Sequence, residues 1–598
     1  MQRFDMNNNK VKRSSFLRNG VNVKFIFFIV ALILLSPYSL LAAVPLKSDG
    51  SKVPNKILTA GADILQVQRA LAKLGFYIGP ENGRLTSDTM AAIKFYQASA
   101  DLTSDGKVTQ SLLDRLEYAL NIKKLMQRLD QIRKKSIKTA RNKLLSHPAT
   151  RKLVMGSQLP EIADPTRDKS SCFNMPTATC LLAEARESAK TIGRDAFRDW
   201  ALSEILIAQA RAGLGEAAYQ TVSQIRDPRL VMVALGDIAN AKASTGNPIA
   251  AITAANLIPD YQRKAEIFLS ISEIQQNRGE IIDARKTLEA FIQNFSSKNG
   301  ELEEVSFLTR AAIVMYQIGD KKYCNKHLKR VEKLITKQKN IELADSSRRY
   351  LAVALANVEQ INAAFRILKK IKKETNRDPV RMNIVRAYGR VGYWVEAQET
   401  AKQIESYRFK AIAFAQIAAS QTSSGSKGLA AKSLVLARSA INKIKRPFAK
   451  SYAISLVAIE VARLYSREEP TDQKFLSSAV QIATNIIDPR LKARTLWLLS
   501  ENRRADGDQK GAKKIALLAM EKTHEIGSTF SQAWMFSSLA IEYAQNNKLD
   551  AGWAAFQNGI KIAKNIENSW NRARTLAKLA TTMIILVDPG RGYQPVQK

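Results

Sequence analysis

The sequence predicts an all-α protein in which a small three-helix domain is followed by a long α-solenoid of helix hairpins. Apolar residues recur at helical spacing in successive segments of the chain. In the C-terminal two-thirds, Gly213, Gly246 and Gly279 follow one another at intervals of 33 residues. The chain has 598 residues, more than the roughly 250–300 that one compact core holds. Several domains or an extended repeat are therefore expected.

The composition is ordinary for a folded protein except in its charge. Hydrophobic residues make up 45% and charged residues 24% of the chain, so disorder is not expected. Lys and Arg number 92 against 54 Asp and Glu, which gives a net charge of +38. This excess indicates an anionic partner, either nucleic acid, anionic lipid or an anionic wall polymer. The three His and three Cys lack the close pairs of common zinc sites, so no metal or other cofactor is expected.

Residues 1–43 have the features of a secretory signal. A basic start is followed by an unbroken apolar run over residues 25–35 and by small residues that end at Ala43. The run is shorter than the about 20 residues of a membrane span, and Pro37 would disturb a continuous helix. Cleavage after Ala43 is expected, and retention as an inner-membrane anchor is the alternative. Both place the rest of the chain in the periplasm or cell envelope.

Residues 62–118 predict three short helices, after a linker at 44–61 that is rich in Lys, Ser, Pro and Gly. The first helix is expected to end at Gly75, before a turn region at 79–83. Thr86 can cap the second helix through its side-chain oxygen. The apolar residues of the third helix are Leu112, Leu113 and Leu116.

This stretch resembles the peptidoglycan-binding domain family, which has a three-helix fold. The matching residues lie in three spaced blocks: 67–71 with 74–77, then Asn82, Gly83, Thr89, Ala92, Ile93, Tyr96 and Gln97, and last Leu102, Gly106 and Leu112. The resemblance implies that the domain binds peptidoglycan.

Several side chains of the domain suit contacts with a glycan. Amide and hydroxyl groups can hydrogen-bond sugar or peptide groups, and tyrosine rings can stack on a sugar face. The alternative is that Asn82 and Gly83 only form the turn, while Tyr96 belongs to the core. The candidate glycan-binding residues are Tyr77, Asn82, Thr86, Thr89 and Tyr96.

Residues 119–155 predict a basic amphipathic helix. Between positions 121 and 153 there are eleven Lys or Arg and a single acid, Asp130. The apolar side of this helix can pack on the preceding domain, pair as a short coiled coil or rest on a membrane surface. Contact with an anionic membrane or wall polymer is one interpretation, and a solvated charged face is the other. The candidate contact residues are Lys123, Lys124, Arg128, Arg133, Lys134, Lys135, Lys138 and Arg141.

A connector rich in Pro and Ser is expected at 156–180. Cys172 and Cys180 lie near its end, and in an oxidising compartment they can close a small disulfide loop.

Residues 181–588 predict about ten helix hairpins that share one sequence frame. The Gly, or Glu359 and Asn547 in its place, ends a helix where a left-handed backbone is needed. Intervals of 40 residues before Gly319 and Asn547 exceed 33 by seven, about two helical turns, and lengthen a helix without rotating its buried face. Five positions after each bend stands a small residue, where neighbouring helices approach closely: Ala218, Ala251, Ala284, Cys324, Ala364, Ala397, Ala430, Ala512 and Gly552.

These hairpins resemble tetratricopeptide repeats, which share the length and the separation of Gly and Ala. Tyr388 and Tyr543 fit the aromatic position of that pattern. The resemblance implies a superhelix with a concave groove that binds protein partners. The tail at 589–598 is expected to be flexible.

No catalytic residue is expected, because the sequence contains no G-x-S-x-G, Walker loop or H-E-x-x-H motif. The leading interpretation is an exported, non-enzymatic envelope scaffold that binds peptidoglycan and an envelope protein. The alternatives are an RNA-binding helical-repeat protein, suggested by the charge and the repeat length, and a regulator of a cell-wall enzyme. The export segment argues against nucleic acid as the partner.

Overall fold

The computed structural model describes residues 57–100, 102–155, 161–164, 166–168, 170–292, 301–464 and 473–589. The predicted export segment, most of the linker at 44–61 and nearly all of the tail lie outside the described residues. The chain divides into two compact units, with the boundary between Ala140 and Arg141. None of the helices in the described part of the chain has both the length and the apolar character of a membrane span.

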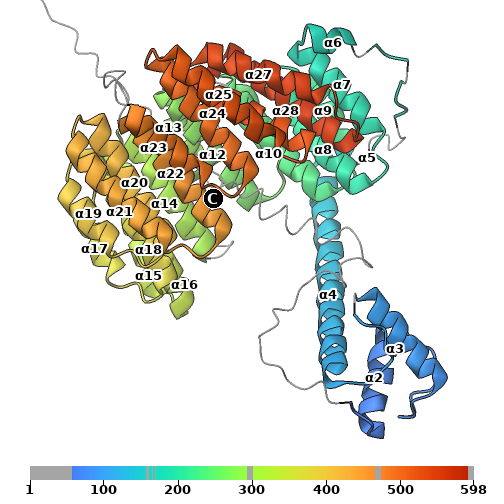
Figure 1. Cartoon of the computed structure of the whole chain (residues 1–598). Helices are drawn as coiled ribbons and strands as arrows, with labels where there is room; N and C mark the ends of the chain where they lie inside the picture. The colour runs from blue at the N-terminus through green and yellow to red at the C-terminus, as the bar shows by residue number, and fades with distance from the viewer. Residues whose placement is uncertain are drawn as a thin grey trace, which may run out of the picture. The chain divides into compact units, whose positions relative to one another are not determined.

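The described residues form α-helices throughout, which confirms the predicted all-α class (Figure 1). Within these residues there is no β-strand, and the one isolated bridge joins Ile57 to Thr109.

Unit 1 is a three-helix domain around a small apolar core. The side chains of Val67, Leu71, Ile93 and Leu116 are fully buried in it. The first helix ends at the expected Gly75, which takes a φ of 91° and closes the helix with its backbone N–H. The helices of unit 1 are α2 (Gly61–Leu74), α3 (Ser87–Ser99) and the first part of α4 (Gln110–Ser146).

Helix α4 differs from the expectation of a short third helix followed by a separate basic helix. It runs without interruption from Gln110 to Ser146. The sequence between these residues contains no Gly or Pro that would stop it. The stop comes at the next Pro, with which α5 (Pro148–Met155) begins.

Unit 2 is an array of hairpins, and in all but one of those described the first helix is longer than the second. It is preceded by α6 (Ser170–Asn174) and α7 (Ala178–Lys190). The hairpins are α8 (Asp195–Arg211) with α9 (Gly215–Ser223), α10 (Pro228–Ser244) with α11 (Pro248–Asn256), α12 (Tyr261–Arg278) with α13 (Ile281–Ile292), α14 (Glu301–Gln317) with α15 (Lys321–Lys337), α16 (Ile341–Asn357) with α17 (Ile361–Leu368), α18 (Glu374–Val391) with α19 (Trp394–Lys402), α20 (Tyr407–Ser423) with α21 (Lys427–Asn442), α22 (Pro447–Leu464) with α23 (Gln473–Thr484), α24 (Pro489–Ala505) with α25 (Gln509–His524), and α26 (Thr529–Gln545) with α27 (Leu549–Ala563).

The bends of the hairpins follow the predicted frame. Every Gly of the series takes a positive φ, and so do Glu359 at 63° and Asn547 at 61°. The small residue five positions later is buried in each case, as for Ala251 and Ala397, both of which are 0% exposed. The predicted lengthening also occurs, since α25 has 16 residues where α9 and α11 have 9.

The two ends of the array meet, a feature that no local pattern of the sequence shows. The last helix, α28 (Ser569–Val587), packs against α7 and α8 at the beginning of the array (Figure 1). Each first helix of a hairpin contacts the next, from α8 through α26 to α28, and α28 contacts α8 again. Helix α7 therefore serves as the second helix of the hairpin that α28 begins, and the repeat array is closed.

Polar and aromatic contacts hold the closure together. The Arg574 guanidinium on α28 forms an ion pair with Glu204 on α8, with 2.9 Å between Nη2 and Oε1. It also lies 4.8 Å from the Trp200 ring centroid and 4.6 Å from that of Trp570. The Thr191 hydroxyl donates to Ser569 Oγ at 2.7 Å. Residues more than 360 positions apart in the chain thus form one packed junction.

Candidate functional site

A buried glutamine fixes the first loop of unit 1. Gln68 projects from α2 and is 0% exposed. Its Oε1 accepts the backbone N–H groups of Asn82 at 3.0 Å and Gly83 at 2.9 Å. Its Nε2 donates to the Arg84 carbonyl at 3.0 Å and to Thr89 Oγ1 at 3.1 Å. The loop between α2 and α3 is therefore attached to the core by one side chain.

A second glutamine holds the next loop in the same way. Gln97 on α3 accepts the Gly106 backbone N–H at 2.9 Å and donates to Asp105 Oδ1 at 2.8 Å. The Lys107 backbone N–H and the Gln97 amide lower the pKa of Asp105. Thr109 then caps α4 by accepting the Leu112 N–H at 3.2 Å. Gln68 and Gln97 belong to the family resemblance, but residue type alone did not assign them a role.

Three of the five candidate glycan-binding residues are buried, which corrects the expectation for them. Tyr77 and Tyr96 are each 5% exposed and Thr89 is 0% exposed, so they cannot lie against a glycan. The Tyr77 hydroxyl donates to the Pro80 carbonyl at 3.0 Å, and Tyr96 donates to the Arg115 carbonyl at 3.3 Å. Their polar groups are thus used within the domain, as buried polar groups usually are.

The other two candidates, Asn82 and Thr86, are exposed. Asn82 Oδ1 accepts the Arg84 N–H at 3.0 Å and Thr86 caps α3, so both also support the loop. Asn82 keeps its side chain at the surface, and its amide hydrogens, which have no acceptor among the described residues, can face a ligand.

An exposed aromatic residue lies on the surface of the same domain. Phe95 on α3 is 67% exposed, and its ring centroid is 5.8 Å from that of the half-buried Phe76. Phe76 in turn contacts the buried Tyr96 edge-on at 5.3 Å. The buried ring supports Phe76, and Phe76 supports Phe95. Sequence reasoning missed Phe95 because an apolar residue on a predicted helix is normally assigned to the core.

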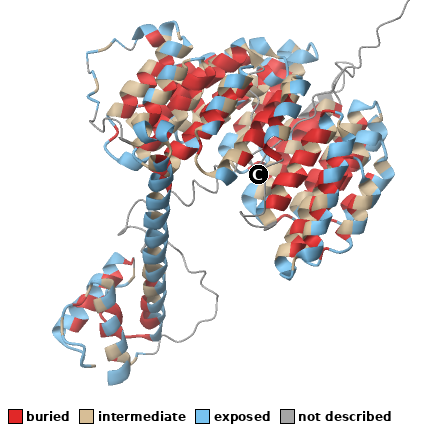
Figure 2. Ribbon diagram, turned by 180° about the vertical axis from the view of Figure 1, so that it is seen from behind, coloured by how far each residue is buried: buried red, intermediate tan, exposed pale blue. Residues whose placement is uncertain are grey.

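The candidate basic residues on α4 are mostly exposed, as Figure 2 shows for the middle of this helix. Lys123 and Arg133 are half-buried, and Lys123 donates to the Lys73 carbonyl at 2.6 Å. The other six, Lys124, Arg128, Lys134, Lys135, Lys138 and Arg141, are exposed.

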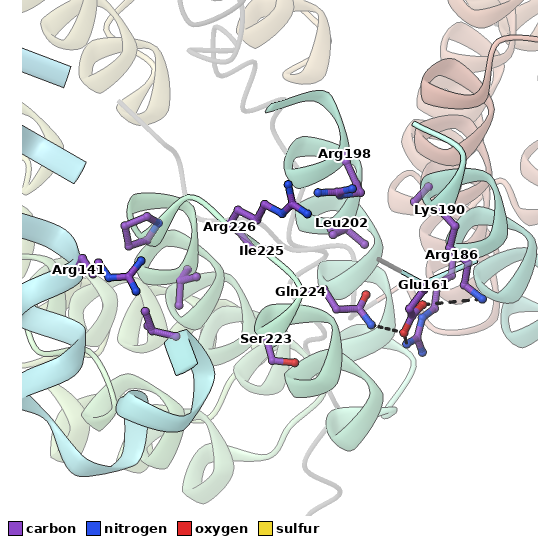
Figure 3. Close-up of a pocket in the computed structure, with 14 residues that line it drawn as sticks. Arg141, Glu161, Arg186, Lys190, Arg198, Leu202, Ser223, Gln224, Ile225 and Arg226 are labelled. Atoms are coloured by element: carbon purple, nitrogen blue, oxygen red, sulfur yellow. Dashed lines mark hydrogen bonds and ion pairs between the residues drawn. The ribbon is translucent and has the colours of Figure 1, made fainter. Parts of the chain in front are cut away.

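A pocket of about 50 Å³ in unit 2 is lined by several charged residues (Figure 3). The guanidinium of Arg186 on α7 is 2.7 Å from Glu161 Oε1, and the Gln224 amide also donates to Glu161. Arg198 and Arg226 both pair with Asp195. Glu161 and Asp195 thus balance much of the positive charge around the pocket. The pair of Glu161 with Arg186 also connects the segment at 161–164 to α7.

A larger groove of about 560 Å³ lies between the hairpins α24–α25 and α26–α27. Trp497, Phe536 and Tyr543 line it from the first helices, and Ala516 and Ala551 line it from the second helices. Helix α27 packs against the next first helix, α28, whereas α25 makes almost no contact with the next first helix, α26. The array is thus less tightly stacked here, and the groove is lined by aromatic and small side chains together with Glu501, Arg504, Lys513 and Asp550.

The three cysteines have two different environments. Cys172 and Cys180 form a disulfide with 5.8 Å between their Cα atoms. Cys324 is a free, buried thiol in the small-residue position of its hairpin, and burial raises its pKa to about 11. The described residues contain no cluster of His, Cys, Asp or Glu that could hold a metal ion.

Comparison with known proteins relates unit 1 to a family. Residues 60–116 match the family described as "Putative peptidoglycan binding domain". "Protein disulfide isomerase pTAC5, chloroplastic" from Arabidopsis thaliana is 41% identical over 71 residues, which are 11% of this chain and 18% of that relative. The chain therefore matches less than a fifth of the relative's length.

The comparison with solved structures returns a match at low identity and with a low TM-score. It is the "Circular tandem repeat protein with novel repeat topology and enhanced subunit contact surfaces", 13% identical over 69% of this chain and 98% of that chain, with a TM-score of 0.18. The family match thus assigns residues 60–116 to a peptidoglycan-binding domain, and the described helices that follow it form a helical repeat array.

Proposed function

We propose that this chain is an exported, non-enzymatic protein of the cell envelope that binds peptidoglycan through unit 1 and a protein partner through the repeat array. The observation that carries the proposal is the family match at residues 60–116. The rigid loops that Gln68 and Gln97 hold give that domain a fixed surface, which favours ligand binding without large ordering costs. The basic residues of α4 add a second attachment, to an anionic membrane or wall polymer.

The glycan-binding surface is centred on Phe95 rather than on the buried tyrosines. A ring that is 67% exposed and supported by Phe76 can stack on the apolar face of a sugar. Asn82, which is exposed in the loop between α2 and α3, offers a polar group on the same domain.

Sedimentation of the full chain with insoluble peptidoglycan, at rising salt, tests this proposal. At a salt concentration that screens exposed charges, Phe95→Ala should lower the affinity about 3–10-fold, as expected for loss of a stack of about 0.5–1.5 kcal/mol. Ile78→Ala is the matched control, because Ile78 is the most exposed apolar residue of the domain and lies outside the aromatic pair. Complete release of the wild type at moderate salt would show that charge alone holds it, and would reject a glycan site.

The groove between α24–α25 and α26–α27 is the proposed binding site for apolar side chains of the protein partner. Trp497, Ala516, Ala551 and Ala554 keep accessible surface in its lining and suit such contacts. Crosslinking in intact cells, followed by purification of the full chain, should recover one envelope protein with crosslinks to residues of α25 or α27. Crosslinks spread evenly over the array would contradict this placement.

An RNA-binding role remains the second candidate because the net charge is +38. Cell fractionation separates the two. Recovery from the envelope fraction supports the proposed function, and recovery from the cytoplasm together with bound RNA supports the second candidate.

A further inference from the structure

Helix α4 carries an apolar stripe that faces solvent. Leu125 is 52% exposed, Leu129 40% and Ile132 58%. With the half-buried Ile122 they follow spacings of three, four and three residues, so they share one side of the helix. Large apolar side chains gathered on one exposed face usually mark a site of interaction.

Basic residues surround this stripe. Arg128 and Lys135 lie along one border of the stripe and Arg133 along the other, as their helical positions require. Among the described residues, no acidic side chain forms an ion pair with any of the eight basic residues from Lys123 to Arg141. Asp130 is the only acid between positions 121 and 153. The surface thus combines apolar contact with an uncompensated positive border.

A second copy of the chain does not fit this surface. If the stripe formed the seam of a parallel two-helix coil, Arg128 of one helix would face Arg133 of the other on both sides. An antiparallel pair would again place basic residues against each other. The seam from Ile122 to Ile132 also covers less than two heptads, whereas stable coiled coils need more.

A dissolved polyanion also fits only half of the surface, because it would bind the basic residues and leave the stripe in water. An anionic lipid surface satisfies both features at once. The Leu and Ile side chains enter the acyl boundary, while the long Lys and Arg side chains extend to the headgroups.

We propose that the segment Ile122–Lys138 of α4 binds in the plane of a membrane that contains anionic phospholipids, with Leu125, Leu129 and Ile132 inserted. The proposed function attached α4 to an anionic membrane or a wall polymer, and this inference selects the membrane. It does not depend on glycan binding by unit 1, so the two can fail separately.

An environment-sensitive fluorophore on the full chain tests the insertion. Cys324→Ala removes the free thiol, and Ala is the usual residue at this position of the repeat frame. In that background, Leu129→Cys carries the label on the stripe, and Gln131→Cys carries it on the opposite, exposed side. Both proteins share the N-terminal segment, so any difference between them reports on α4 alone.

Vesicles of phosphatidylglycerol with phosphatidylcholine should shift the emission of the label at position 129 to the blue, and that at position 131 much less. Vesicles of phosphatidylcholine alone, and soluble polyphosphate, should leave both unchanged. An equal shift at both positions, or no shift at 129, would overturn the proposal. A shift at 129 with polyphosphate alone would also overturn it, in favour of a wall polymer.

Two sets of substitutions complete the test by vesicle sedimentation. Leu125→Ser, Leu129→Ser and Ile132→Ser together should weaken binding at least about tenfold, and Arg128→Gln, Arg133→Gln and Lys135→Gln together on the order of 100-fold. Ile249→Ser, Ile282→Ser and Val395→Ser form the matched control, because these apolar side chains are even more exposed and lie on the array. If the three Ser substitutions left vesicle binding unchanged, the lipid partner would be rejected. It would also be rejected if these substitutions converted a dimer of the chain to a monomer, because the stripe would then bind a second copy. Binding to peptidoglycan should persist in all sets.

Discussion

Single polar side chains determine the shape of unit 1. Gln68 satisfies two backbone N–H groups of a tight turn, and Gly83 in that turn takes a φ of 74° close to α2. A Cβ atom at Gly83 would lie 2.7 Å from the Gly61 carbonyl oxygen, so the turn cannot move towards the helix. Among the described side chains, only that of Gln68 accepts hydrogen bonds from the backbone N–H groups of both Asn82 and Gly83.

Gln68→Ala should lower the free energy of unfolding of unit 1 by about 1–3 kcal/mol, because two partly buried backbone N–H groups lose their acceptor. Thermal unfolding followed by near-ultraviolet circular dichroism and by amide exchange of residues 82–89 would measure this. The exposed Gln127→Ala is the control and should have no effect. An unchanged exchange rate at Asn82 and Gly83 would show that water replaces Gln68.

His327 gives the array a dependence on pH. It is 4% exposed on α15, and burial lowers its pKa to about 4, with a further contribution from Arg330 and Lys326 and an opposing one from Asp320. In the unfolded chain its pKa is about 6.5, so between these values the unfolded state binds the extra proton. The stability from neutral His327 is complete above about pH 6.5 and is lost as the pH falls through 4.

The free energy of unfolding should therefore fall by about 3 kcal/mol between pH 6.5 and pH 4. Histidine-labelled NMR spectra would assign the resonance that disappears in His327→Gln, and its midpoint should lie near pH 4. A midpoint at pH 6 or above would show that the ring is accessible to water.

Residue type could not distinguish ligand contacts from internal ones in unit 1. Tyr77, Thr89 and Tyr96 suit a glycan as well as they suit a buried network, and only the three-dimensional fold decides between these roles. The same limit hid Phe95, whose exposure depends on how α3 is rotated on α2. By contrast, the caps at Thr86 and Gly75 were predictable because they depend on local backbone chemistry.

At the scale of elements, the repeat frame was predictable because it is a local requirement repeated many times. A left-handed bend favours Gly or Asn, with Glu359 as the exception, and the helix that follows must approach its neighbour closely. Helix α4 was predicted less well, since two patterns of different composition were read as two helices although nothing between them stops a helix.

Ala251→Leu should destabilise the array by about 1–3 kcal/mol, because Ala251 is 0% exposed and three added carbon atoms have no space. The midpoint of urea unfolding of the full chain would measure it. Ile249→Leu serves as the control, because Ile249 is on the same helix and 79% exposed. A loss near zero would show that the assigned frame is wrong.

At the scale of the whole array, closure was not predictable from the sequence. Helix α7 precedes the first glycine of the frame, and α28 follows the last, so neither appears as half of a hairpin. Their pairing joins segments at opposite ends of the array, and no periodic pattern encodes a contact of that kind. An open solenoid propagates stability only between neighbours, whereas a closed one has no terminal repeat.

Closure leads to a prediction that an open array does not make. Removal of residues 569–598 should speed amide exchange in α7 and α8 as well as in α26 and α27, because α28 packs on both ends. Arg574→Ala should produce a smaller increase at the same places, since it removes the pair with Glu204 and the contacts with the Trp rings. The exposed Lys564→Ala controls for loss of a positive charge near the junction. If exchange increased only in α26 and α27, the ends of the array would be independent in solution, and each hairpin would be stabilised by its chain neighbours alone.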